Sequence, residues 1–122
     1  MSKILLVDDE PGLLLFIARL IKANGHDALT ATDGVEALKI VKETEVDLVL
    51  TDLRMPRMDG MTLLREIKAL KPTMPVILLT AYASAETELE SKKIGAYEYR
   101  SKPFNVDKLL DTINNALQER KI

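Results

Sequence analysis

The sequence predicts an α/β protein with a single doubly wound parallel sheet of five strands and helices on both faces. Short apolar segments alternate with amphipathic helical segments five times, with short connections between them. This alternation is typical of parallel strands joined by right-handed crossovers. The apolar run at residues 46–51 resembles a central strand that is buried on both faces. Polar residues then follow four of the five predicted strands, which indicates a site at one edge of the sheet.

Composition limits the classes of protein to consider. The chain has 122 residues, 47% of them hydrophobic, which suggests one globular domain over residues 1–122. Its net charge of −2 predicts no direct binding of nucleic acid. The lack of cysteine and the single His26, expected to be solvated in a turn, exclude thiolate and multi-histidine metal sites. The first apolar run, residues 4–7, is too short for a signal peptide or membrane span, so we expect a cytoplasmic protein without membrane contact.

The first half of the chain predicts three strands and two helices. Strands are expected at residues 4–7, 27–31 and 46–51. The first helix should run from Pro11 to about Ala23, since proline is favoured in the first turn and the preceding acids suit its N-terminus. Thr32 or Asp33 should cap the second helix. The expected inner faces are Leu13, Phe16, Ile17, Leu20 and Ile21 in the first helix, and Val35, Leu38 and Val41 in the second.

The second half predicts three helices and two strands. Helices are expected at residues 61–70, 85–94 and from the Asn105 cap to about Arg120, with strands at 75–79 and 96–101. The helix at 85–94 is poor in large apolar residues, so we expect it to be the most loosely packed. The expected inward-facing residues are Leu64, Ile67 and Leu70 in the third helix, Leu89 and Ile94 in the fourth, and Leu109, Leu110, Ile113 and Leu117 in the last.

The polar residues after the strands form one predicted site. Asp8 and Asp9 follow the first strand, Asp52 the third, Thr80 the fourth and Lys102 the fifth. Each has an ordinary structural explanation when taken alone, such as a capping acid or a surface lysine. Parallel strands, however, bring their carboxyl ends to one edge, where open α/β sheets bind ligands. We therefore expect these five side chains to lie together.

The chemistry of this set favours phosphoryl transfer. Clustered carboxylates repel one another and need a counter-charge. With oxygen ligands alone the natural ion is Mg²⁺, with Mn²⁺ as a substitute, and Mg²⁺ favours phosphate as a co-ligand. The Thr80 hydroxyl and the Lys102 ammonium suit a bound phosphoryl group. A carboxylate is itself able to act as the nucleophile, and Asp52, on the central strand, is best placed to do so.

The sequence resembles the receiver domains of two-component response regulators along essentially its whole length. The matching segments are residues 7–10, Asp52 with residues 55–60, Thr80-Ala81 and residues 95–104. The resemblance implies the flavodoxin- and CheY-like three-layer α/β/α fold with strand order 2-1-3-4-5. It also implies a cis peptide bond between Lys102 and Pro103.

The resemblance also implies roles for the site residues. Asp52 would take a phosphoryl group from a sensor histidine kinase or phosphotransfer protein, in a switch rather than an enzyme acting on another substrate. Asp9, Asp52 and the backbone carbonyl of Arg54 would hold Mg²⁺, with Asp8 acting largely through water. The fourth helix, fifth strand and fifth helix would then signal to a downstream output domain or protein. Thr80 and Lys102 would contact the phosphoryl group, and Tyr99 would be the switch aromatic.

The resemblance leaves open a homodimer formed on phosphorylation and whether the receiver belongs to a longer regulator.

Arg54 and Tyr82 occupy positions that the family varies to tune phosphoryl lifetime. Arg100 stands where the family more often has an apolar residue. We expect it either to be exposed or to face the last helix, where Asp107 and Asp111 are candidate partners.

Two other classes of function are less well supported by the residues. A Mg²⁺-dependent phosphohydrolase would need a general acid or base beside Asp52, and the sequence offers none. A flavodoxin-like nucleotide binder would need a phosphate loop rich in glycine, serine or threonine after the first strand. The acids at residues 8–10 would instead repel phosphate unless a cation intervened.

Overall fold

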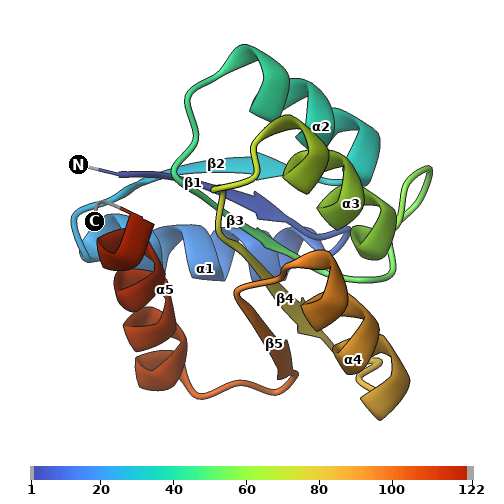
Figure 1. Cartoon of the computed structure of the whole chain (residues 1–122). Coiled ribbons are helices and arrows are strands. Elements are labelled where there is room, and N and C mark those ends of the chain that lie inside the picture. Colours follow the sequence, from blue (N-terminus) through green and yellow to red (C-terminus); the bar gives the residue numbers. More distant parts are fainter. Residues whose placement is uncertain (1, 121–122) are drawn as a thin grey trace.

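The computed structural model describes residues 2–120, which contain one five-stranded parallel sheet (Figure 1). The strand order is β2-β1-β3-β4-β5, and all four pairings are parallel. The predicted doubly wound α/β fold and the strand order implied by the resemblance are therefore confirmed. The strands are β1 (Lys3–Val7), β2 (Asp27–Ala31), β3 (Leu48–Thr51), β4 (Val76–Thr80) and β5 (Glu98–Ser101).

Five helices cover the two faces of the sheet and complete three layers. Figure 1 shows α1 and α5 on one face and α2, α3 and α4 on the other. Among residues 2–120, no helix has the length and apolar character needed to span a membrane. The helices are α1 (Pro11–Ala23), α2 (Gly34–Glu43), α3 (Gly60–Leu70), α4 (Ala85–Ile94) and α5 (Val106–Arg120).

The central strand β3 is buried on both sides, as its apolar sequence predicts. Successive side chains of a strand point to opposite faces. Val49 accordingly packs in the core under α2 and α3, whereas Leu48 and Leu50 pack in the core under α1 and α5. All three side chains are almost fully buried. The strand ends are therefore fixed by cores on both faces.

Four of the helices begin with a side chain that caps the first turn, and at the start of α5 the cap is Asn105, as predicted, with Oδ1 accepting the N–H of Lys108 at 3.0 Å. Asp33, Asp59 and Ser84 each accept a hydrogen bond from the backbone N–H three residues later. Gly60, directly after Asp59, lies so close to β3 that a Cβ atom there would overlap the backbone carbonyl oxygen of Asp52. Its own N–H donates to the carbonyl of Leu53 at 2.8 Å. The start of α3 therefore fixes the backbone at the end of β3.

The inner faces of three helices differ from the prediction. Phe16, Val35 and Leu70 were expected to face inward but are 48%, 41% and 47% exposed. In α2 and α3 the predicted residues are spaced repeatedly by three, and because a helix turns about 100° per residue they drift around its surface. The buried face alternates steps of three and four instead. The buried residues of α2, for example, are Gly34, Ala37, Leu38 and Val41. In α1 the buried face is rotated away from Phe16, toward Leu14 and Ala18.

The expectation that Leu89 anchors α4 is also wrong. Leu89 is 57% exposed, and the buried residue of this helix is Ser91. Ile94 does pack partly against the core, because it lies at the end of the helix nearest β5. The charged residues on the other sides of α4 leave it without an apolar stripe. The structure therefore supports the prediction that α4 is weakly packed, and α4 has fewer apolar contacts than expected because Leu89 faces solvent.

Several local expectations need small corrections. β3 begins at Leu48 and β5 at Glu98, each two residues later than predicted. Asp47 and Tyr97 each donate one backbone hydrogen bond to the neighbouring strand, but the regular pairing starts only at the residue that follows. β4 spans Val76–Thr80 and so includes the candidate threonine.

His26 is not a solvated loop residue: its ring is half-buried, and Nε2 lies 3.2 Å from Oδ1 of Asn114 on α5. The α1–β2 turn thus packs against α5.

Candidate functional site

Three carboxylates meet at the carboxyl ends of β1 and β3. The two strands are paired with Val7 opposite Thr51, which places Asp8 beside Asp52. One carboxylate oxygen from each of Asp8, Asp9 and Asp52 lies within 4.8 Å of the others. Asp8 and Asp52 are buried and Asp9 is exposed. The acidic group predicted from the strand ends is therefore assembled by the register of the sheet.

The Lys102 ammonium joins the two buried carboxylates. Its Nζ lies 2.8 Å from Oδ2 of Asp8 and 3.2 Å from Oδ2 of Asp52. Burial alone would lower the pKa of Lys102, but its hydrogen bond to Asp8 and the charges of both acids outweigh burial and raise that pKa above its ordinary value. Lys102 is thus a cation at neutral pH. Its peptide bond to Pro103 is cis, as the resemblance implies.

The two buried carboxylates are held in the same manner. Oδ1 of Asp8 accepts the N–H of Glu10 at 2.9 Å, and Oδ1 of Asp52 accepts the N–H of Leu53 at 2.6 Å. In each case Oδ2 is the oxygen that faces Lys102. Each carboxylate therefore has one oxygen fixed by backbone and one directed toward the cation.

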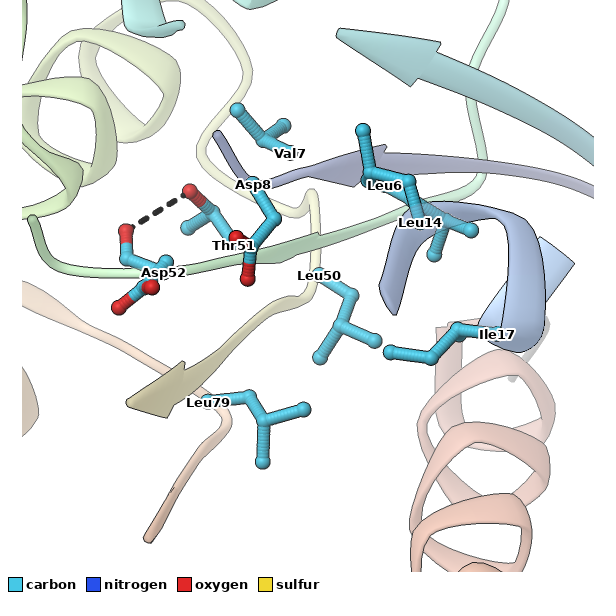
Figure 2. Close-up of a pocket in the computed structure, with 9 residues that line it drawn as sticks. All are labelled: Leu6, Val7, Asp8, Leu14, Ile17, Leu50, Thr51, Asp52 and Leu79. Carbon is cyan, nitrogen blue, oxygen red and sulfur yellow. Dashed lines mark hydrogen bonds between the residues drawn. The ribbon is translucent and has the colours of Figure 1, made fainter. Parts of the chain in front are cut away.

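The side of the site toward the core is apolar. Figure 2 shows Asp8, Thr51 and Asp52 together and, beside them, a group of leucine and isoleucine side chains from β1, α1, β3 and β4. These residues enclose a cavity of about 10 Å³, close to the smallest space that holds one water molecule. An apolar wall lowers the local dielectric constant and strengthens the attraction between Lys102 and the carboxylates. The lining residues are Leu6, Val7, Asp8, Leu14, Ile17, Leu50, Thr51, Asp52 and Leu79.

Arg54 and Tyr82 form a stacked pair beside the site. The guanidinium carbon of Arg54 lies 4.1 Å from the centre of the Tyr82 ring, within the range of a cation–π interaction. The N–H of Tyr82 donates to the hydroxyl of Thr80 at 3.0 Å, and Thr80 is fully buried. The pair thus connects the loop after Asp52 with the loop after Thr80. The sequence indicated both positions separately, but not their contact.

Tyr99 is bonded to the start of α4. Its hydroxyl accepts the N–H of Ser84 at 3.1 Å and lies 2.6 Å from the hydroxyl of Thr87. Ser84 is the N-cap of α4, and its side chain accepts the N–H of Thr87. The ring of Tyr99 packs against the core under α2, α3 and α4. The position of this ring and the capping of α4 are therefore linked by hydrogen bonds.

Arg100 faces α5, as expected from strand alternation, but its predicted acidic partners are wrong. Its Nη2 donates to the hydroxyl of Thr112 at 2.8 Å and to Glu98 at 3.2 Å. Asp107 and Asp111 are exposed, whereas Thr112 lies on the buried side of α5. The guanidinium of Arg100 therefore hydrogen-bonds to the Thr112 hydroxyl on the inner face of α5 and not to an acid on its outer face.

Comparison with known proteins gives the family. A model of the response regulator receiver domain matches residues 4–114, nearly the whole chain. The chain belongs to this family. The matched region includes every residue of the site described above, and the receiver domain has the phosphoacceptor role in two-component signalling.

Curated relatives of this receiver domain include long and short proteins. It is 40% identical over 118 residues to the transcriptional regulatory protein GlrR of Escherichia coli K12, an overlap of 97% of this chain and 27% of GlrR. It is 36% identical over 116 residues to the sporulation initiation phosphotransferase F of Bacillus subtilis 168, an overlap of 95% of this chain and 94% of that protein. The chain therefore spans about a quarter of one relative and nearly all of the other.

Solved structures agree with the fold of this receiver domain. A receiver domain protein from Clostridium thermocellum superposes with a TM-score of 0.94 at 40% identity and covers 99% of this chain and 98% of that one. The beryllofluoride-activated NtrC4 receiver domain dimer gives 0.93 at 34% identity, with coverage of 98% and 99%. The similarity extends to a receiver that was solved as an activated dimer.

The acidic group suits the divalent ion that receiver domains bind. Receiver domains hold Mg²⁺ through acidic residues, and the three carboxylates here offer only oxygen donors within 4.8 Å of one another. Hard oxygen ligands of this kind are those that Mg²⁺ prefers. Asp9 is exposed and therefore open to an ion from solvent. The donor set of this structure fits the metal.

Sequence reasoning did not single out Thr51 among the residues near the site. The available signal was a hydroxyl at the end of an otherwise apolar strand, directly before Asp52. Its side chain donates to the carbonyl of Asp52 at 3.0 Å.

Proposed function

We propose that Asp52 is the residue of this receiver domain that accepts the phosphoryl group. The observation that supports it is the convergence of Asp8, Asp52 and Lys102 at the ends of three strands, with Lys102 within 3.2 Å of both acids. Oδ1 of Asp52 is held by the N–H of Leu53. Oδ2 faces Lys102 and is therefore the oxygen that we assign to the new bond.

The proposed reaction is a transfer from phosphohistidine. Oδ2 of Asp52 forms a bond to phosphorus while the phosphorus–nitrogen bond of the donor breaks, and the imidazole nitrogen keeps the electron pair. The product is an acyl phosphate on Asp52. The Lys102 ammonium would attract the phosphoryl oxygens, and the Thr80 hydroxyl would donate to one of them after giving up its bond from Tyr82.

The metal ligands in this proposal are Asp9, Asp52 and the backbone carbonyl of Arg54, with Asp8 acting indirectly. When bound, Mg²⁺ or Mn²⁺ supplies positive charge that offsets both the carboxylates and the phosphoryl group. The protein's own part is to fix this geometry. The cores on both faces of β1 and β3 hold Asp8 and Asp52 in place, and the start of α3 holds the loop that carries Arg54.

Incubation with a small acyl-phosphate donor tests the function. We expect the intact mass to increase by one phosphoryl group with Mg²⁺ or Mn²⁺, and no increase in the presence of a chelator. Asp9→Ala should require more Mg²⁺ for the same rate of labelling, because one of the proposed ligands is removed. No mass gain under any condition would overturn the function, and an unchanged Mg²⁺ titration of Asp9→Ala would remove Asp9 from the ligand set.

We further propose that residues 1–122 act as one switch domain and not as an enzyme with a separate substrate. Its output would be the surface of α4, β5 and α5. α4 has a single buried residue, Ser91, and its first turn is bonded to Tyr99. If Thr80 moves toward the phosphoryl group, the ring of Tyr99 gains space to move, and its bonds to Ser84 and Thr87 break. The cytoplasmic location remains a prediction.

Backbone amide chemical shifts should change across this surface when beryllofluoride is bound. We expect changes from Asp52 through Thr80 to residues 84–104, because Tyr99 joins the strand to the cap of α4. Tyr99→Phe removes only the hydroxyl and should speed hydrogen exchange in the first turn of α4 without any phosphoryl mimic. Shifts that stay within the immediate neighbours of Asp52 would exclude this surface as the output.

The lifetime of the acyl phosphate should depend on the Arg54–Tyr82 pair. Hydrolysis needs a water molecule in line with the bond to Asp52, and the stacked side chains occupy the region beside Thr80. We expect the double variant Arg54→Ala/Tyr82→Ala to lose the phosphoryl group several-fold faster than wild type. Each single variant should show most of this change, because neither side chain keeps its position without the other.

The decay of labelled protein after removal of the donor gives these rates. Arg65→Ala provides the control, since Arg65 is an exposed arginine paired with Glu90 between α3 and α4. Equal decay in wild type and the double variant, or additive effects of the two single variants, would contradict the shared role.

A further inference from the structure

Thr51 buries a hydroxyl where an apolar side chain would match its neighbours. It follows Leu48, Val49 and Leu50 in β3 and is only 1% exposed. Strand alternation places it on the same side as Val49, toward the core under α2 and α3. Valine has nearly the same shape and no polar group to bury, and a buried hydroxyl without a partner is costly. The hydroxyl therefore depends on the bonds that it makes.

The partners of the hydroxyl lie in the loop that follows β3 and not on a neighbouring strand. The Oγ1 of Thr51 donates to the backbone carbonyl of Asp52 at 3.0 Å, the contact drawn in Figure 2. It also lies 3.8 Å from the sulfur of Met55, which packs against the core. The two partners stand on either side of the segment that contains Arg54. The hydroxyl thus contacts both ends of the turn from Asp52 to Met55, and its single hydrogen atom bonds to the nearer acceptor, the Asp52 carbonyl.

The same turn is also held from α3. Gly60 donates its N–H to the carbonyl of Leu53 at 2.8 Å, and the N–H of Leu53 donates to Oδ1 of Asp52 at 2.6 Å. The direction of the Asp52 carboxylate therefore depends on the peptide that follows it. The Thr51 hydroxyl holds the carbonyl of that same peptide.

We propose that Thr51 is a positioning residue for the candidate phosphoacceptor site. Its hydroxyl fixes the peptide between Asp52 and Leu53, and through it the direction of the Asp52 carboxylate and of the Arg54 carbonyl. Thr51 itself touches neither the phosphoryl group nor the donor. The inference rests on the proposed function of Asp52, because it concerns the geometry of that site. A site that is held loosely binds and reacts less well than one that is fixed in advance.

Thr51→Val and Thr51→Ser separate the hydroxyl from the shape of the side chain. Valine keeps the shape and removes the hydroxyl, whereas serine keeps the hydroxyl and removes a methyl group. Thr112→Val is the matched control, because Thr112 is also buried and bonded but lies on α5, next to Arg100. Three measurements apply to each variant: Mg²⁺ affinity by calorimetry, the initial rate of labelling at saturating Mg²⁺, and amide shifts of residues 52–55 without metal.

We expect Thr51→Val to bind Mg²⁺ roughly tenfold more weakly and to label more slowly by a similar factor, the size of effect that one hydrogen bond produces. Its amide shifts at residues 52–55 should change before any metal is added. Thr51→Ser should stay within about twofold of wild type in both measurements. Thr112→Val should lower the midpoint of urea unfolding but leave the Mg²⁺ affinity unchanged.

Three results would overturn the proposal, and they have different meanings. Wild-type Mg²⁺ affinity and labelling in Thr51→Val would show that the hydroxyl does not position the site. Equal losses in Thr51→Ser and Thr51→Val would assign the effect to the methyl group. Wild-type protein that neither binds Mg²⁺ nor labels would overturn the function of Asp52 itself, and the role of Thr51 with it.

Discussion

Asp52→Asn is expected to abolish the gain of a phosphoryl group from an acyl-phosphate donor. The asparagine side chain has the size of the aspartate but lacks the negative oxygen that attacks phosphorus. The fold should persist, because Asp8 still pairs with Lys102 at 2.8 Å and the repulsion between the two buried carboxylates is removed. Intact mass after incubation with Mg²⁺ measures the result, and urea unfolding checks that the variant is folded.

Asp111→Asn is the matched control for this experiment. It makes the same chemical change at an exposed position of α5, outside the group of carboxylates at the strand ends. We expect it to label at the wild-type rate. Full labelling of Asp52→Asn would show that another carboxylate accepts the phosphoryl group, and Asp8 and Asp9 would then be the residues to test next.

Gly60→Ala should combine a large loss of stability with a loss of labelling. A Cβ atom at this position would overlap the backbone carbonyl oxygen of Asp52, and backbone on both sides is held by the packed sheet and by α3. Overpacking at such a site costs about 1–3 kcal/mol or more of unfolding free energy. Relief of the overlap would also shift the peptide that directs the Asp52 carboxylate. Urea unfolding and the labelling rate measure the two effects.

Gly12→Ala makes the same change where there is room for it. Nothing lies within 4 Å of the added Cβ at Gly12, which is in the first turn of α1. Since alanine favours helix by up to about 1 kcal/mol over glycine, this variant should be as stable as wild type or more so. Equal stability of Gly60→Ala and wild type would show that the end of β3 yields easily, contrary to the packing described here.

The position of the candidate site follows from the topology, and so the sequence predicts it well. The order of strands and helices alone decides that Asp8, Asp52, Thr80 and Lys102 come to the same edge. The side chains need only follow the strands directly. Errors of two residues in the start of β3 and β5 do not alter this result, because the site lies at the opposite ends of those strands.

Contacts between side chains from different loops are harder to predict. Arg54 and Tyr82 lie in separate loops, and nothing in the sequence gives the distance between their exposed side chains. The bond from Tyr99 to Ser84 likewise depends on the angle at which α4 meets β5. The predicted buried faces of the helices were wrong for a related reason. Val35 has an apolar side chain suited to the core, but the rotation of α2 about its axis is set by tertiary packing.

The sparse packing of α4 has a consequence for how proteins with this plan diversify. Of residues 85–94, Ser91 alone is buried, and Leu89 and most of the charged residues face solvent. Substitutions on the outer face of this helix therefore remove little buried area and carry little thermodynamic penalty. A new partner specificity is able to arise there by single steps that leave the folded population intact. A protein engineer who wishes to redirect such a switch would therefore randomise the exposed positions of α4 and leave Ser84, Thr87 and Tyr99 unchanged.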